Sequence, residues 1–133
     1  MTRKEAREQL FCLVFEQSFT TENASDIFEL AREVRDFEED EYVRSVFLGI
    51  AQKRDELDRM IGEACQGWTV ERLSRVALSA MRLALYEMLY REDIPVSVSI
   101  NEAVELIKQY ATKDDASFAN GVLGTIARAQ GLQ

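Results

Sequence analysis

The sequence of 133 residues contains no histidine. Histidine is the side chain best suited to proton transfer near neutral pH and the commonest nitrogen ligand of metal ions. The spacing patterns of common catalytic and phosphate-binding motifs (GxSxG, the P-loop, GxGxxG and HExxH) are also missing. We therefore expect no catalysis, no cofactor, no metal site and no small-molecule substrate.

Helix-breaking residues and cysteine are scarce as well. One proline and six glycines leave few places to interrupt a helix, which favours an all-α fold. Cys12 and Cys65 lie far apart and form no CxxC pair. We interpret them as buried apolar residues of a reducing compartment, with a disulfide or metal role as the alternative. No uncharged apolar run of about 18 residues is present, so we expect no membrane span and a cytoplasmic protein.

Basic residues are outnumbered by acidic ones. The chain has 16 lysines and arginines against 24 acidic residues, which gives a formal net charge of −8. A protein that coats nucleic acid through bulk charge is usually basic. This balance argues against that mode of binding but leaves room for a local basic patch. The apolar share of 47% and the charged share of 30% are typical of one folded domain, here expected to span 1–133.

Apolar residues recur at helical spacing through most of the chain. They predict six helices, or seven if the third divides between Gln52 and Glu56. The expected ranges are 3–18, 25–34, 39–63, 70–91, a helix capped by Ser97 or Ser99, and 116–130. Capping-box patterns pair a hydroxyl with a glutamate three residues later. They are found at Thr2 with Glu5 and at Ser99 with Glu102, while Thr69 is the expected cap of the helix 70–91.

The inner faces of the first two helices are predicted from the same periodicity. In the first helix the expected core residues are Ala6, Leu10, Leu13 and Val14. In the second helix they are Ile27, Leu30, Ala31 and Val34.

The segment 70–91 is apolar nearly all round, which is typical of a helix buried on most sides. A narrow polar stripe on it comprises Arg75, Ser79 and Arg82. We expect Arg75 and Ser79 to be exposed and to contact a protein partner. Arg82 and Glu87 are expected to be structural and to pair with neighbours near the bundle surface, because a charge on a largely buried helix needs a partner.

Two arginines and two phenylalanines follow one another at intervals of four along the first helix. The row Arg3, Arg7, Phe11 and Phe15 turns from basic to aromatic. Cationic groups suit phosphates and aromatic faces suit unstacked bases, so the row fits single-stranded RNA. The alternative is that both phenylalanines belong to the core and both arginines are ordinary surface residues.

A second candidate site opens the last helix. Phe118 either anchors the core or contacts a ligand, whereas the amide of Asn120 suits a hydrogen bond to a base or a phosphate. Gly121 and Gly124 weaken this helix by about 1 kcal/mol each relative to alanine. Their presence indicates close helix packing or backbone exposed to a ligand.

Several segments together carry a resemblance to a known family. They are Ala6-Arg7-Glu8, then Arg82 before Leu83-Ala84-Leu85-Tyr86-Glu87, Asp93-Ile94-Pro95, Ile100-Asn101-Glu102-Ala103-Val104-Glu105-Leu106, and Phe118-Ala119-Asn120-Gly121-Val122-Leu123. In this order and at these spacings the set resembles the NusB family of bacterial transcription antitermination factors, over the whole chain. The resemblance implies an all-α fold of two packed three-helix bundles.

The resemblance also implies a function. It predicts binding of boxA-type single-stranded RNA together with NusE, the small-subunit ribosomal protein that doubles as a transcription factor, within the RNA polymerase antitermination complex. The RNA contacts that it implies are Arg3, Lys4, Arg7, Phe15, Asp114, Phe118 and Asn120. The family commonly has tyrosine at the position of Phe15 and a longer arginine-rich N-terminus. The alternative is a non-catalytic helical interaction or scaffold protein, such as a homodimer, that keeps the fold without RNA recognition.

Overall fold

The computed structural model describes residues 1–35, 40–65 and 70–132. Within them it contains seven α-helices, one short 3-10 turn and no strand, which confirms the all-α prediction. The helices are α1 (Arg3–Gln17), α2 (Ala24–Arg35), α3 (Glu41–Gln52), α4 (Arg54–Ala64), α5 (Arg75–Tyr90), α6 (Val96–Tyr110) and α7 (Lys113–Ala129), with the turn η1 at Val70–Arg72. No described helix is both long enough and apolar enough to cross a membrane.

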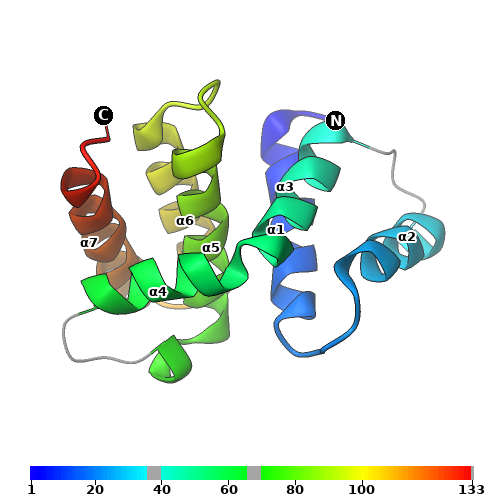
Figure 1. Ribbon diagram of the computed structural model, residues 1–133, viewed down its shortest axis with the longest axis horizontal. Helices are drawn as coiled ribbons and strands as arrows, with labels where there is room; N and C mark the ends of the chain where they lie inside the picture. Colours follow the sequence, from blue (N-terminus) through cyan, green and yellow to red (C-terminus); the bar gives the residue numbers. More distant parts are fainter. Residues whose placement is uncertain (36–39, 66–69, 133) are drawn as a thin grey trace.

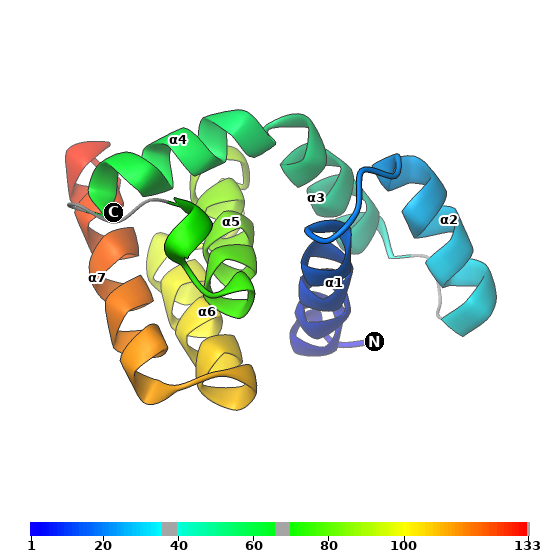
Figure 2. The same ribbon diagram turned by 90° about the horizontal axis from the view of Figure 1, so that it is seen from below.

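The helices form two groups of three, joined by α4 (Figures 1 and 2). Helices α1, α2 and α3 contact one another, and so do α5, α6 and α7. Helix α4 continues from α3 across the second group and contacts α5 and α7. Helices α1 and α3 both pack on α5, so the two groups share one apolar core. This arrangement confirms the expected pair of three-helix bundles.

The first helix begins as its sequence predicts. The backbone N–H of Thr2 donates to Glu5 Oε1 at 3.0 Å, and the N–H of Glu5 donates to Thr2 Oγ1 at 3.1 Å. This reciprocal pair satisfies two of the free donors at a helix start. The expected core residues Ala6, Leu10, Leu13 and Val14 are all buried. The expected break in the third helical region is confirmed too, because α3 ends and α4 begins on either side of Lys53.

Three helix starts differ from the prediction. The helix predicted at 70–91 begins only at Arg75, where Ser74 Oγ accepts from the N–H of Ala77 at 3.0 Å; the expected cap Thr69 lies outside the described residues. Helix α6 begins directly after Pro95, which has no N–H to leave unsatisfied and a φ of −60°. Helix α7 begins at Lys113 because Thr112 caps it, three residues before the predicted start.

The prediction for the inner face of α2 is partly wrong. Leu30 and Val34 are 58% and 73% exposed, whereas Phe28 is buried and lies 6.5 Å from the ring of Phe47 on α3. Helix α2 lies at the edge of the molecule, and its main packing contacts among the described elements are with α1 and α3 (Figure 1). A helix with so few neighbours buries a narrower strip than periodicity alone indicates.

The most buried helix is α5, as its composition predicts. Eleven of its sixteen residues are buried, and it contacts α1, α3, α4, α6 and α7. The approach of α3 to α5 depends on Gly49, since a Cβ there would lie 2.1 Å from the hydroxyl oxygen of Tyr86. Neither cysteine forms a disulfide with a described residue; Cys65 is buried, which raises the pKa of its thiol, and Cys12 is half-buried.

Candidate nucleic-acid interface

The start of α1 carries two exposed basic side chains, Arg3 and Lys4. The guanidinium of Arg3 lies 4.2 Å from the centre of the Tyr42 ring, which is a cation–π contact. The ammonium of Lys4 lies 3.9 Å from Glu102 on α6. The side chain of Lys4 is 68% exposed, so this pair holds it only weakly. Both cations are available to phosphates.

Arg7 differs from these two residues, and its expected place on the surface is wrong. Its side chain is only 5% exposed. Its Nε lies 3.0 Å from Glu87 Oε2 and its Nη2 lies 3.3 Å from Glu87 Oε1, while Glu102 is 3.8 Å away. Burial disfavours the charged guanidinium, but the hydrogen bonds and the charge of Glu87 outweigh that effect and raise the pKa of Arg7. Arg7 therefore connects the first bundle to the second through its ion pair with Glu87 on α5.

Glu87 is the centre of a buried polar cluster. It is fully buried and accepts hydrogen bonds from Arg7, from the hydroxyl of Tyr42, and from Ser99 Oγ at 2.7 Å. Burial and the adjacent carboxylate raise the pKa of Tyr42, so the phenol stays a donor. The expected capping role of Ser99 is wrong, because Ser99 lies inside α6 and its hydroxyl binds Glu87 instead.

Arg82 also has the partner that was expected of a charge on a buried helix. Its Nε and Nη2 lie 2.7 and 2.8 Å from the two carboxylate oxygens of Asp58 on α4. This two-bonded pair ties α5 to the crossing helix α4. The structural interpretation of Arg82 and Glu87 is confirmed, except that Glu87 pairs inside the core and not near the surface.

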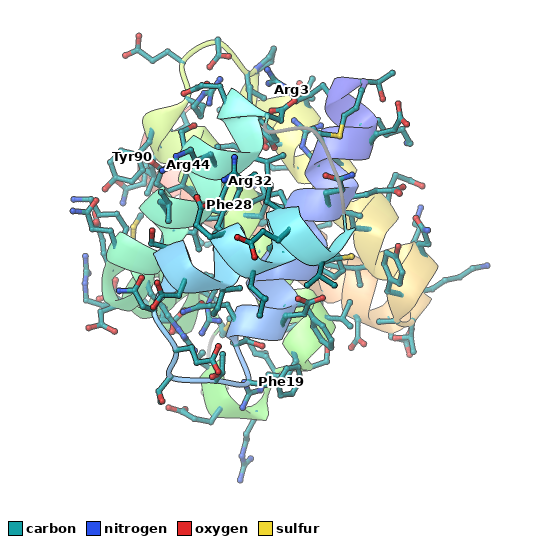
Figure 3. The ribbon with its side chains drawn as sticks, turned by 90° about the vertical axis from the view of Figure 1, so that its right-hand side faces the viewer. Arg3, Phe19, Phe28, Arg32, Arg44 and Tyr90 are labelled. Carbon is teal, nitrogen blue, oxygen red and sulfur yellow. The ribbon has the colours of Figure 1, made fainter. Side chains whose placement is uncertain are left out.

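The aromatic part of the row continues beyond the predicted residues. The ring of Phe11 is buried between Tyr110 at 5.4 Å and Phe15 at 6.2 Å. Phe15 is half-buried and meets the edge of Phe19 at 4.9 Å. Phe19 and Tyr110 are 60% and 46% exposed. The row therefore runs from the core to two accessible rings, and Figure 3 shows Phe19 at the end of the molecule opposite Arg3.

The three candidate residues at the start of α7 differ in how far they are exposed. Asp114 and Asn120 are exposed, and Phe118 is half-buried against the core. Asp114 and Phe118 line a hollow of about 190 Å³ together with Leu73, which lies just before α5, and Ala77 in the first turn of α5. Asn120 is not among the residues that line this hollow. The C-terminal end of α1 and the starts of α5 and α7 lie toward the same lower side of Figure 1.

Only one of the two expected partner contacts on α5 is exposed. Arg75 is exposed, hydrogen-bonded to the carbonyl oxygen of Ser18, and placed 4.9 Å from the Phe19 ring. Ser79 is fully buried, and its hydroxyl has no partner among the described residues. The expectation of an exposed Ser79 is wrong because α5 is covered on nearly every side, which leaves its polar stripe open only at the first turn.

Sequence reasoning missed Phe19 and Tyr110. Phe19 continues the spacing of four from Phe11 and Phe15, so the signal was present, but the predicted end of the helix at residue 18 cut the row short. Tyr110 has the spacing of an inner residue of α6 and lies at its last position, where the helix face is open. Neither ring has a sequence pattern that distinguishes a binding residue from a core residue.

The fold and these side chains define a class of protein: an all-helical module with exposed cations and aromatic rings along one helix. The NusB family model matches residues 3–128. A transcription antitermination protein NusB of Clostridium botulinum is 38% identical over 93% of this chain and 98% of its own length. The chain belongs to the NusB family.

Solved structures agree with this assignment. A structure described as "T. maritima NusB" superposes with a TM-score of 0.87 at 32% identity, covering 96% of this chain and 92% of its own. A structure described as antitermination factors NusB and NusE in complex with dsRNA has a TM-score of 0.85 at 25% identity and covers 96% of both chains.

Proposed function

We propose that this chain is a transcription antitermination factor that binds boxA-type single-stranded RNA together with a NusE-type ribosomal protein. In this role it helps RNA polymerase pass terminators, acts in the bacterial cytoplasm, and contributes binding surfaces without catalysis or a cofactor. Membership of the NusB family supports the proposal, as does the likeness to a structure of NusB with NusE and RNA.

The observation that carries the RNA-binding part is the composition of α1. Its first turn exposes Arg3 and Lys4, and its last turns lead through Phe15 to the open ring of Phe19. By the rise of 1.5 Å per residue, the basic and aromatic ends of the helix lie roughly 20 Å apart. An extended single strand can follow such a line, with phosphates on the cations and bases on the rings.

The start of α7 supplies the remaining contacts in this proposal. Asn120 presents an exposed amide that can both donate to and accept from a base edge. Asp114 is exposed and can accept from a base amino group, while Phe118 forms one wall of the adjacent hollow. Arg7 has a supporting role in this scheme, since it holds α1 against α5.

RNA binding by variants that remove either the exposed cations or an aromatic ring of α1 tests the proposal. The double variant Arg3→Gln with Lys4→Gln removes two cations, and Phe15→Ala removes a ring. We expect Phe15→Ala to weaken boxA-type RNA binding by roughly 5- to 150-fold, because base stacking contributes about 1–3 kcal/mol. The control is Arg59→Gln, which removes the charge of an exposed arginine on α4 that pairs with Glu63. If all variants bind like the wild-type protein, the non-catalytic scaffold is the correct description.

A further inference from the structure

A large open cavity adjoins the aromatic end of α1 and includes residues to which no role has been given so far, among them Gln52, Arg54 and Asp55. It has a volume of about 800 Å³ and lies where the end of α1 meets the α3–α4 junction and the start of α5. Its lining includes Phe19, Thr20, Gln52, Arg54, Asp55 and Arg75. Most of this lining is polar, so the cavity suits a charged or hydrogen-bonding ligand.

The cavity is positively charged in a protein that is otherwise acidic. Two guanidiniums, Arg54 and Arg75, face one carboxylate, Asp55, among its lining residues. Arg82 is close by, but Asp58 neutralises it at 2.7 Å. Arg54 has no ion pair within the described part of the chain. Burial is the main cause that lowers the pKa of Arg54; the charges of Arg82 and Arg75 act in the same direction and those of Asp58 and Asp55 oppose them.

An open aromatic ring lies beside these cations. Phe19 is 60% exposed, and the guanidinium of Arg75 lies 4.9 Å from its centre. Arg75 also donates to the carbonyl oxygen of Ser18, which fixes the guanidinium next to the ring. Phe19 touches Phe15 edge to face, so the ring continues the aromatic row of α1 into the cavity. A stacking surface and phosphate-binding groups are therefore adjacent.

We propose that this cavity binds one further nucleotide unit of the RNA strand, with its base on Phe19 and its flanking phosphates on Arg54 and Arg75. The inference rests on the proposed function, because it extends an RNA path along α1 by one step beyond Phe15. It assigns Arg75 to RNA in place of the protein partner. A basic ribosomal protein is repelled by two guanidiniums, whereas a phosphate is attracted by them.

The test compares charge-neutral variants of the cavity with a control on the same helix. Arg54→Gln and Arg75→Gln are made singly and combined, and Arg59→Gln serves as the control for the single Arg54→Gln change, since it also removes one charge from α4 but away from the cavity. RNA affinity is measured against salt concentration for the full chain, with and without the NusE-type partner. We expect the double variant to reduce the slope of log K against log salt by about 1.4, at about 0.7 per phosphate on a single strand. The control should leave the slope unchanged.

A second variant and a shorter RNA separate the possible failures. Phe19→Leu keeps an apolar side chain and should weaken binding of the full RNA but not of an RNA shortened by the nucleotide in the cavity. Arg54→Lys keeps the charge and distinguishes a lost phosphate contact from misfolding. Wild-type protein that fails to bind RNA overturns the proposed function. RNA binding that depends on Arg3 and Phe15 but not on Arg54 and Arg75 overturns this inference alone. The inference is also overturned if the Arg75→Gln variant fails to bind the NusE-type partner when no RNA is present.

Discussion

Arg7 and Glu87 form a buried ion pair between α1 and α5, with Arg7 Nε 3.0 Å from Glu87 Oε2, although 80 positions separate them in the sequence. The pair connects the first bundle to the central helix of the second. Because Tyr42 and Ser99 also donate to Glu87, the carboxylate is satisfied on both oxygens. A buried ion pair of this kind fixes how two elements meet more than it adds net stability.

Replacing Arg7 by alanine should therefore destabilise the fold. The change leaves Glu87 charged, buried and without its counter-ion, which typically costs about 3–5 kcal/mol. Denaturant unfolding measures the effect, and Lys4→Ala is the control because that side chain is 68% exposed. The Arg7→Met, Glu87→Met double variant should recover part of the loss. An Arg7→Ala variant with wild-type stability and weakened RNA binding would place Arg7 in the binding site instead.

The prediction for Arg7 shows where sequence reasoning is limited. Helical spacing correctly placed Arg7 one turn from Arg3, and the cap at Thr2 correctly fixed where α1 begins. The spacing could not show that Glu87 faces Arg7, because that contact depends on how two distant helices pack. The same limit applies to Ser79. Its place on a polar stripe predicted an exposed side chain, but the neighbouring helices bury it completely. Local patterns predict elements, whereas burial depends on the assembly of all of them.

Two glycines should respond to alanine in opposite ways. A Cβ at Gly121 meets nothing within 4 Å, so Gly121→Ala should stabilise α7 by about 0.5–1 kcal/mol through helix propensity. A Cβ at Gly49 would lie 2.1 Å from the Tyr86 hydroxyl oxygen, so Gly49→Ala should destabilise the fold by about 1–3 kcal/mol through overpacking. Thermal or denaturant unfolding measures both. If Gly121→Ala stabilises the protein but weakens RNA binding, the ligand approaches the backbone of α7.

Asp93 should titrate well below an ordinary aspartate. The guanidinium of Arg91 hydrogen-bonds it at 2.9 Å and lowers the pKa of Asp93 from 3.8 to about 2. Because the folded pKa is depressed, this interaction stabilises the fold above pH 3.8, and the contribution is lost as the pH falls through 2. NMR titration of the carboxyl carbon measures the midpoint. Arg91→Gln should return it to near 3.8 and Arg59→Gln should not; a wild-type midpoint near 4 contradicts the pair.

The charge distribution predicts how RNA affinity depends on salt and on the partner. With Arg7 buried, the exposed cations on the proposed RNA path are Arg3 and Lys4, and the cavity adds Arg54 and Arg75. Four phosphates neutralised on a single strand give a slope of log K against log salt near about −2.8. A dedicated basic binder that makes six or more contacts would give about −4 or steeper.

The chain alone should bind boxA-type RNA weakly, because 24 acidic residues against 16 basic ones surround the path with a negative field that slows encounter. The same field should recruit a basic ribosomal protein, which then adds phosphate contacts of its own and steepens the slope. Linkage requires RNA to tighten the protein pair by the factor by which the partner tightens RNA binding. Calorimetry measures both factors when RNA is titrated into the chain with and without the partner, and the partner is titrated into the chain with and without RNA. Tight RNA binding by the chain alone, or a salt slope that the partner leaves unchanged, would contradict the prediction that the partner supplies part of the phosphate contacts.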